Sequence, residues 1–178
     1  MKKLFFAPAL AVMIAFASCG GNNTNTDANQ TTTNEESTDV ATELATVPGI
    51  ENVTLSNKWT VQGDDQMKFD THLIRVKAGE AVELTFKNVG SMPKESMGHN
   101  IVVLKPGVDL PTFGGEAAAA SDNEYIPKSS LSSIVAHTKL LGPGEEDKIT
   151  FTLEKGIYDY ICSFPGHYGI MKGQIVAE

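Results

Sequence analysis

The sequence is poor in cysteine and in basic residues, and both shortages narrow the possible classes of protein. Only two cysteines are present, Cys19 and Cys162, so the chain can form at most one internal disulfide. Lysine and arginine number 14 against 22 aspartates and glutamates, which gives a formal net charge of −8. This acidity argues against binding to nucleic acid and against electrostatic docking to anionic lipid. The sequence also lacks internal repeats and a glycine-rich phosphate loop.

The N-terminal segment has the pattern of an export signal rather than that of a membrane span. Two lysines precede an apolar run over residues 4–16, whose 13 residues are fewer than the roughly 20 that a transmembrane helix needs. Small residues then lead to Cys19, and this junction resembles the lipobox of bacterial lipoproteins, with Phe16 where leucine is usual. We expect residues 1–18 to be a signal peptide and Cys19 to carry a lipid. The alternatives are ordinary cleavage near Cys19, which leaves a soluble protein, and a buried helix.

A polar linker follows this segment. Residues 20–46 are dominated by Asn, Thr, Asp and Glu, and they carry too little apolar surface to offset the entropy of ordering. We expect residues 19–50 to form a disordered linker that begins at the lipidated cysteine, and residues 51–178 to form the folded domain. This organisation predicts a protein of the cell envelope, on the periplasmic or outer-surface side, which contacts the membrane only through its lipid.

The domain has the pattern of an all-β protein. Short apolar or alternating segments are separated by turn signals such as Lys105-Pro106-Gly107, which favours a sandwich or barrel. The expected strands are residues 72–77, 81–86, 101–104, 148–153, 157–161 and 173–176. Residues 109–133 interrupt this pattern, because Glu116 and the four alanines after it favour a helix. We therefore predict a β-sandwich or barrel with one short helical insertion.

Cys162 is the residue that most needs a function. If Cys19 carries a lipid, Cys162 has no disulfide partner, and an unpaired thiol outside the cytoplasm is a liability. His167 and Met171 follow within ten residues, and thiolate, imidazole and thioether together are a soft ligand set suited to copper. His99, just before an expected strand, supplies a second imidazole. A zinc site is disfavoured by the methionine, and a thiol nucleophile is disfavoured because no orienting third group is evident.

These blocks give the domain a close resemblance to the azurins, a family of bacterial cupredoxins. The resemblance spans about residues 57–176. It rests on Met97-Gly98-His99-Asn100, on residues 136–142, on residues 162–167 with Met171-Lys172-Gly173, and on residues 65–69, which resemble an early strand of the family. It implies a Greek-key sandwich that holds one type 1 copper ion.

The resemblance also implies roles for single residues. His99, Cys162 and His167 would bind copper in a plane, with Met171 on one axial side and the carbonyl of Gly98 on the other. Next to these ligands, Asn100 would tie the two ligand segments together, and the backbone N–H of Phe164 would donate to the sulfur. The ring edge of His167 would be the exposed port for electrons. It would lie within an apolar patch formed by Met67, Met92, Met97, Phe164, Pro165 and Ile170.

The function implied is that of a single-electron carrier, not of an enzyme. It would exchange electrons with redox proteins, such as cytochromes or copper or haem reductases, by transient docking and without a small-molecule substrate. One alternative is a protein that stores or delivers copper. Another is a copper oxidase or nitrite reductase, but His72 and His137 are too few spare histidines for a trinuclear cluster.

Three departures from the azurins lead to further expectations. The chain has no cysteines for the disulfide that azurins form near their N-terminus, so stability must come from the sandwich core. Asn88 stands where azurins have a buried histidine, so we expect no reduction potential that depends on pH between 6 and 8. Ile101 replaces a core aromatic residue, and the only tryptophan is Trp59, so the family's buried-tryptophan signal should be absent.

Overall fold

The structure is a computed structural model that describes residues 47–178. The expected signal peptide, Cys19 and the linker up to residue 46 lie outside the described residues. Within the described part, Val47 and Ile50 are buried and pack with Val176, and Ile50–Asn52 forms a short 3-10 helix, η1. The expected boundary at residue 51 therefore falls inside a packed segment.

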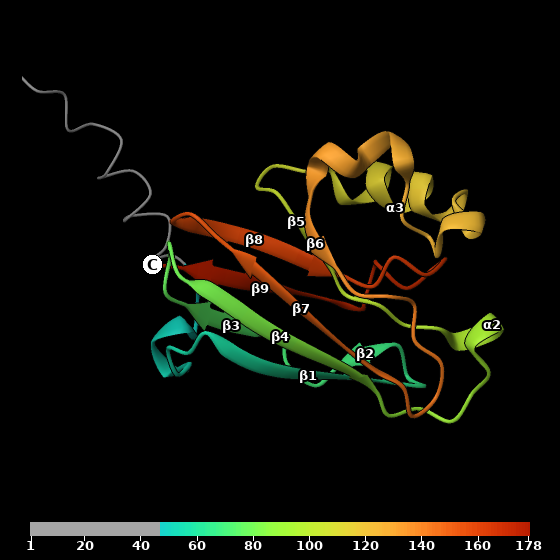
Figure 1. Ribbon diagram of the computed structural model, residues 1–178, viewed down its shortest axis with the longest axis horizontal. Helices are drawn as coiled ribbons and strands as arrows, with labels where there is room; N and C mark the ends of the chain where they lie inside the picture. Colours follow the sequence, from blue (N-terminus) through green and yellow to red (C-terminus); the bar gives the residue numbers. More distant parts are fainter. Residues whose placement is uncertain (1–46) are drawn as a thin grey trace, which may run out of the picture. The chain divides into compact units, whose positions relative to one another are not determined.

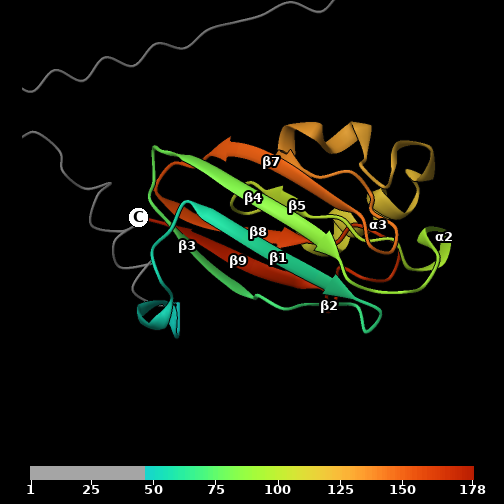
Figure 2. The ribbon, with the colours of Figure 1, turned by 60° about the horizontal axis from the view of Figure 1, so that its bottom comes forward.

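Two β-sheets face each other and form the body of the domain (Figures 1 and 2). One sheet has the order β2 (Lys68–Phe69), β1 (Lys58–Asp64), β4 (Ala81–Asn88) and β7 (Glu146–Thr152). The other has the order β3 (Leu73–Val76), β9 (Lys172–Ala177), β8 (Gly156–Ile161), β5 (Val102–Leu104) and β6 (Ile134–His137). The pairs β1–β4 and β3–β9 are parallel and the other pairs are antiparallel. The chain passes repeatedly from one sheet to the other, and the predicted all-β fold is confirmed.

The core lies between the sheets and follows from the alternation of residues along each strand. In β4 the side chains of Val82, Leu84 and Phe86 are buried, whereas the residues between them are only partly buried. The ring of Phe86 meets that of Phe69 edge-on at 5.8 Å, and Phe69 packs against Tyr160 of the opposite sheet at 5.4 Å. This aromatic cluster joins the two sheets in a domain whose described part contains a single cysteine.

The sequence located some strands better than others. All six predicted strands, at residues 72–77, 81–86, 101–104, 148–153, 157–161 and 173–176, agree with observed strands to within two residues. β1 and β6 were not predicted, because in β1 only Val61 and Gly63 are buried, which leaves its alternation weak in the sequence, and β6 has no buried residue. The segment 65–69 is not one strand, since Asp65 to Met67 form the turn before β2 and Met67 has a φ of 56°.

The predicted helical insertion in residues 109–133 is confirmed, although it is divided into several pieces. Helix α3 (Leu110–Ala118) is followed by the 3-10 helices η2 (Ser121–Asn123) and η3 (Lys128–Ser133). Asp109 caps α3, because its carboxylate accepts a hydrogen bond from the backbone N–H of Thr112 at 3.0 Å. Phe113 and Ala117 lie one turn apart on its buried face, in a cluster with residues of β5 and β8.

A further helical turn lies outside the predicted insertion. Helix α2 (Lys94–Met97) is one turn long and lies just before His99. The carbonyl of Pro93 accepts hydrogen bonds from the N–H groups of Ser96 and Met97, so the turn closes without an apolar repeat that the sequence could display. Between residues 47 and 178 no helix has both the length and the hydropathy to cross a membrane.

Candidate metal centre

The backbone of His99 is held in place by a bridge to Leu141. Its N–H donates to the carbonyl of Leu141 at 3.1 Å, and the N–H of Leu141 donates back at 2.7 Å. Gly98 packs too closely for a side chain, because a Cβ there would lie 2.7 Å from the carbonyl oxygen of Lys94. The fully buried imidazole of His99 therefore enters the domain from a backbone fixed on both sides.

The loop after β8 folds back on itself and brings together residues that are close in sequence. The N–H of Cys162 donates to the carbonyl of Met171 at 2.9 Å, and the N–H of Met171 donates to the carbonyl of His167 at 2.8 Å. The N–H of His167 donates to the carbonyl of Phe164 at 3.0 Å. Gly166 lies at the tip with a φ of 81°, a conformation that favours glycine.

Three buried side chains converge where these two segments meet. The sulfur of Cys162 lies 3.9 Å from Nδ1 of His99 and 3.6 Å from Nδ1 of His167, and the three ligand atoms all lie within 4.8 Å of one another. Typical metal–nitrogen and metal–sulfur bonds of about 2.0 and 2.3 Å in a trigonal plane separate the two donor atoms by about 3.7 Å. The spacing of these residues therefore fits one metal ion with planar N₂S ligation.

Burial shifts the pKa values of the three groups in directions that suit a metal. Burial lowers the pKa of His167 to about 4, with a further contribution from the charge of His99. Burial also lowers the pKa of His99, against the opposing influence of the Asp64 backbone and of nearby carboxylates. Both imidazoles are therefore neutral near pH 7 and have lone pairs available.

The thiol shows the complementary effect. Burial raises the pKa of Cys162 to about 12, and the backbone N–H groups of Asn100 and Phe164 partly oppose this rise. A thiol with such a pKa is not a nucleophile at neutral pH, and it loses its proton only when a cation stabilises the thiolate. The donor set therefore fits a soft metal ion and not a cysteine enzyme.

One polar atom at the centre lacks a hydrogen bond. Nε2 of His99 is, within the described residues, the only buried side-chain nitrogen or oxygen without a partner at normal geometry. It belongs to the ring whose Nδ1 faces the sulfur, and the backbone of Asp64 is near enough to raise the imidazole pKa. The ring of His99 is therefore placed so that Nδ1 faces the sulfur, although Nε2 is left without a hydrogen bond.

Hydrogen bonds from Asn100 join the two ligand-bearing segments. Its side-chain oxygen accepts from the N–H of Ser163 at 2.8 Å, and its side-chain nitrogen donates to the hydroxyl of Ser163 at 2.8 Å. Ser163 was not singled out from the sequence, although its position next to Cys162 could have suggested it. Asn88 is also buried, and its amide donates to the carbonyl of Leu141.

The two predicted axial residues lie on the segments that form the centre. Met171 is fully buried, and its methyl carbon lies so close to Gly63 that a side chain there would clash at 2.7 Å. Gly98 directly precedes His99. Their roles as axial ligands remain predictions.

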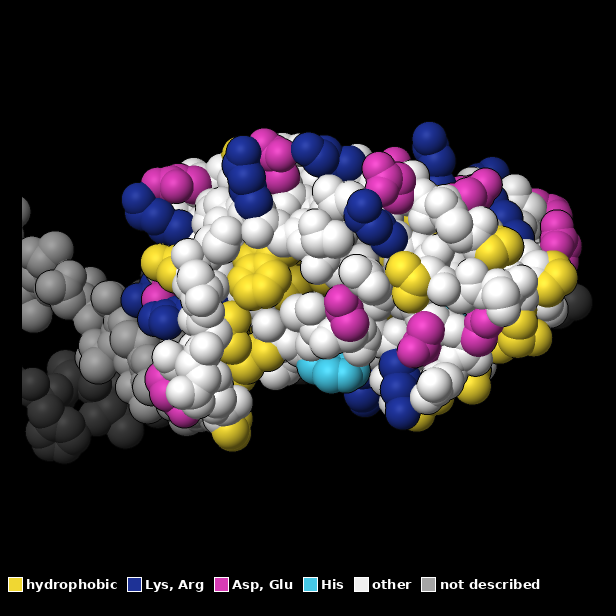
Figure 3. All heavy atoms as spheres, turned by 90° about the horizontal axis from the view of Figure 1, so that it is seen from below, with side chains coloured by type: hydrophobic (Ala, Val, Ile, Leu, Met, Phe, Trp, Pro, Cys, Tyr) yellow, Lys and Arg dark blue, Asp and Glu magenta, His cyan; other side chains and the backbone are white. Residues whose placement is uncertain are grey.

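The residues of the predicted apolar patch are exposed to different extents. Ile170 and Met92 are 56% and 40% exposed, Met67, Met97 and Pro165 are partly exposed, and Phe164 is buried. His167 is only 3% exposed, so much less of its ring reaches the surface than the sequence suggested. Hydrophobic side chains gather at the right-hand end of Figure 3, the end at which Figure 1 shows α2, with acidic side chains among them.

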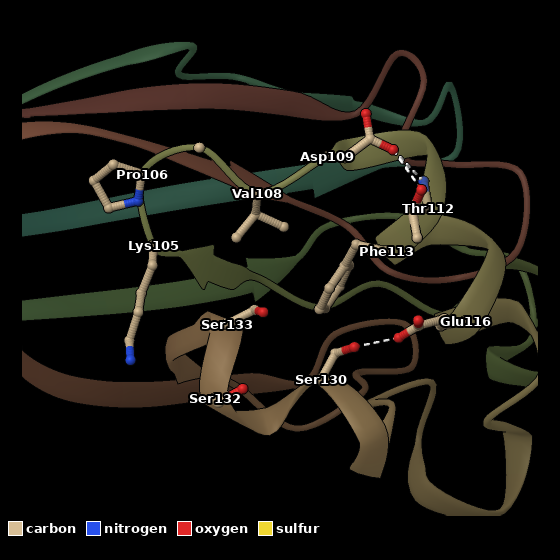
Figure 4. A pocket seen from close by; sticks show the side chains of 11 residues that line it. Lys105, Pro106, Val108, Asp109, Thr112, Phe113, Glu116, Ser130, Ser132 and Ser133 are labelled. Carbon is tan, nitrogen blue, oxygen red and sulfur yellow. Dashed lines mark hydrogen bonds between the residues drawn. The ribbon is translucent and has the colours of Figure 1, made fainter. Parts of the chain in front are cut away.

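The remaining histidines and a surface groove beside α3 lie apart from the centre. His72 and His137 each have Nδ1 within hydrogen-bond distance of a backbone carbonyl, and neither belongs to the cluster of ligand atoms. The groove runs between α3 and η3, where Glu116 accepts a hydrogen bond from Ser130 (Figure 4). None of the predicted ligands lines it.

A two-sheet domain with a buried His–Cys–His cluster at the junction of two loops defines the class of mononuclear copper proteins. The family of copper binding proteins, plastocyanin/azurin family, matches residues 55–178, and the chain belongs to this family. Both the predicted azurin-like character and the predicted copper cofactor are confirmed. Membership assigns copper binding to this chain at the level of the family.

Individual relatives support the same assignment. The azurin of Pseudomonas fluorescens biotype C is 40% identical over 126 residues, which cover 68% of this chain and 98% of that azurin. The outer membrane protein H.8 of Neisseria gonorrhoeae is 40% identical over 120 residues, which cover 65% of this chain and 64% of that protein.

Two solved structures share the fold. Na-dithionite reduced auracyanin from Roseiflexus castenholzii has a TM-score of 0.63 and 32% identity, over 70% of this chain and 99% of the other. An azurin from the methylotroph Methylomonas sp. strain J has a TM-score of 0.61 and 34% identity, over 68% and 97%.

Proposed function

We propose that this protein carries single electrons by outer-sphere transfer between redox proteins, through one copper ion held by His99, Cys162 and His167. The observation that carries the proposal is the convergence of two Nδ1 atoms on one buried sulfur, at 3.9 and 3.6 Å. In this proposal Met171 and the carbonyl of Gly98 would complete the ligand set. When bound, copper supplies a centre that alternates between the Cu(I) and Cu(II) states.

The residues of the chain contribute rigidity to this function. The backbone bridge at His99, the closed loop from Cys162 to Met171 and the Asn100–Ser163 bonds each hold a ligand-bearing segment without the metal. Ligands that are fixed in this way change position little between oxidation states, so little reorganisation opposes electron transfer. The N–H groups of Asn100 and Phe164 face the sulfur and favour its anionic form.

Burial of the ligands favours an electron carrier over the two rival functions. His99 and Cys162 are fully buried and His167 is 3% exposed, so a substrate has no direct approach to the ligand atoms. A protein that delivers copper needs a labile ion, whereas these ligands are covered and held by hydrogen bonds. An enzyme would need an accessible coordination position.

The apolar patch is the proposed docking surface for redox proteins. Ile170 and Met92 are its most exposed members, and Ile170 lies one residue before Met171 on the ligand loop. A small apolar surface suits complexes that must form and separate quickly. We infer that partners dock here and exchange electrons across the covered edge of His167.

The envelope is the proposed location. The N-terminal pattern ending in Cys19 and the similarity to a protein named outer membrane protein H.8 both support it. The full chain should partition with membranes when expressed with its N-terminal segment, and Cys19→Ser should release it. A wild-type chain that remains in the soluble fraction would contradict the lipid anchor.

An absorption spectrum of the oxidised, copper-loaded protein tests the ligand set. A strong visible band from thiolate-to-copper charge transfer is expected, and Cys162→Ser should abolish it. The matched control is His137→Ala, which removes an exposed histidine outside the cluster and should leave the band unchanged. A colourless wild-type protein after copper loading and oxidation would refute the proposal.

A further inference from the structure

We propose that the two-residue turn Glu124–Tyr125 positions the metal centre from outside, by holding the ring of Phe164 against His167. The inference rests on the proposed function and adds two positioning residues to it. Neither residue was singled out from the sequence. Both belong to the segment that follows η2, far along the chain from the ligands they would support.

The backbone of the turn is the first observation. Glu124 and Tyr125 both have left-handed conformations, with φ values of 52° and 63°. Residues other than glycine adopt this conformation rarely, and it persists only where the surroundings impose it. Two such residues in succession indicate that the positions of both side chains matter.

Glu124 contacts three residues in the two segments that hold His99. Its carboxylate accepts a hydrogen bond from the N–H of Leu140 at 3.1 Å and lies 3.6 Å from the ammonium group of Lys94. Its backbone carbonyl accepts a longer hydrogen bond, at 3.5 Å, from the side chain of Asn100. Lys94 begins the α2 turn five residues before His99, Asn100 follows His99 directly, and Leu140 precedes the residue that forms the bridge with His99. Glu124 therefore ties together the backbone on which His99 is mounted.

Tyr125 begins a row of aromatic rings that ends at the metal centre. Its ring centroid lies 5.0 Å from that of Phe164, with the planes inclined at 66°. Phe164 lies 4.7 Å from the ring of His167, and His167 lies 5.1 Å from the ring of His99. These separations lie within the range of favourable aromatic contacts. A displacement of the first ring would therefore be transmitted to both proposed imidazole ligands.

Phe164 connects Tyr125 to the metal centre, because its ring contacts both Tyr125 and His167. It lies two residues after Cys162, it is 8% exposed, and its carbonyl accepts the N–H of His167. Tyr125 and Phe164 line a surface groove together with Leu140, so the tyrosine ring covers one side of the phenylalanine. Without that ring Phe164 would be free to move into the groove, and the path from solvent to the thiol would open. Tyr125 is thus a positioning residue that does not touch the metal.

The experiment compares Tyr125→Ala, which removes the ring, with Tyr125→Phe, which keeps it. In the metal-free protein, the rate of Cys162 alkylation by iodoacetamide should rise about tenfold in Tyr125→Ala, because loss of the aromatic contact favours local opening. In the copper-loaded protein, Tyr125→Ala should change the electron paramagnetic resonance spectrum and shift the reduction potential. Tyr125→Phe should match the wild type in all three measurements.

A distant aromatic residue provides the structural control. Trp59→Ala removes a partly buried ring at the end of β1 remote from Asp64, so it should lower stability without changing the spectrum or the potential. If Tyr125→Ala does not fold, Tyr125→Leu fills the site without an aromatic ring and should show the same changes.

Three results would overturn the inference. In the first, Tyr125→Ala has the alkylation rate and the spectrum of the wild type. In the second, Tyr125→Phe changes as much as Tyr125→Ala does. In the third, Trp59→Ala changes the spectrum and the potential as much as Tyr125→Ala does. Failure of the inference can be separated from failure of the proposed function. A wild-type protein without the thiolate–copper band would refute the function, whereas a normal wild type with an unaffected Tyr125→Ala would refute only the positioning role.

Discussion

Phe86 and His99 are both fully buried, but the two regions to which they belong are stabilised differently. Around Phe86 the neighbouring rings pack through apolar contacts, and the hydroxyl of Tyr160 in this cluster donates a hydrogen bond to the carbonyl of Thr71. Around His99, two imidazoles and a thiol have been removed from water, and one of their nitrogens lacks a hydrogen bond. From this comparison we expect the core to be stable without a ligand, whereas the stability of the metal centre should depend on metal and on pH.

The largest expected effect comes from the core. Phe86→Ala should lower the free energy of unfolding of the metal-free protein by about 3–5 kcal/mol, because it removes a buried ring and leaves a cavity. Denaturant unfolding measures this loss. Val89 lies three residues after Phe86 but is exposed, so Val89→Ala should change stability by less than about 0.5 kcal/mol. A small effect of Phe86→Ala would contradict the description of the core.

Acid should destabilise the metal-free protein through the metal centre. Burial lowers the pKa of His167 from 6.5 to about 4, so between these values the unfolded chain binds more protons than the folded one. Stability is then full above pH 6.5 and falls as the pH drops toward 4, by roughly 2–3 kcal/mol. His137→Ala should keep this dependence, and His167→Gln should weaken it, because the lowered pKa of His99 still contributes. Unfolding curves measured across this pH range that coincide for wild type and His167→Gln would contradict the prediction.

Copper should stabilise the domain by binding only the folded state. At free copper a hundredfold above the dissociation constant, the gain is about 2.7 kcal/mol. Thermal unfolding with and without copper measures it, and Cys162→Ser should lose most of the gain while its metal-free stability stays close to that of the wild type. An equal gain in both proteins would indicate that copper binds elsewhere.

A smaller effect is expected where hydrogen bonds join the ligand segments. Asn100→Ala leaves the buried N–H of Ser163 without its acceptor, which should lower stability by about 1–3 kcal/mol. The visible band should also change, since both ligand-bearing segments lose their connection. Ser163→Ala removes only the hydroxyl partner and should have the milder effect on unfolding. The reverse order of the two variants would argue against this role for Asn100.

The smallest effect on stability, and a large one on function, is expected at the surface. Ile170→Lys should leave unfolding unchanged, because the side chain is exposed, but it should slow electron self-exchange by placing charge in the apolar patch. Leu131→Lys makes the same change at a comparably exposed residue of η3 and should leave the rate unchanged. Equal rates in the two variants would place the docking surface elsewhere.

Much of the fold could be predicted because strands with one buried face alternate visibly. The strands around Leu84, Phe151 and Ile175 were located from that alternation, and the helical insertion from its alanines. β1 and β6 could not be located in this way, because few of their side chains are fully buried. The α2 turn escaped notice because it is too short to show a helical period.

The sequence by itself determined the chemistry of the copper loop. Cys162, His167 and Met171 lie within ten residues on either side of a Pro-Gly turn, and local chain geometry is enough to bring such residues together. It also determined the class of fold and the resemblance that pointed to His99.

Tertiary structure alone decided the rest. Contacts between His99 and Leu141, Asn100 and Ser163, and Tyr125 and Phe164 join residues 39 to 63 positions apart, and no local pattern encodes them. The shifted pKa values and the near-complete covering of His167 arise in the same way, because desolvation depends on which distant segments pack over a group.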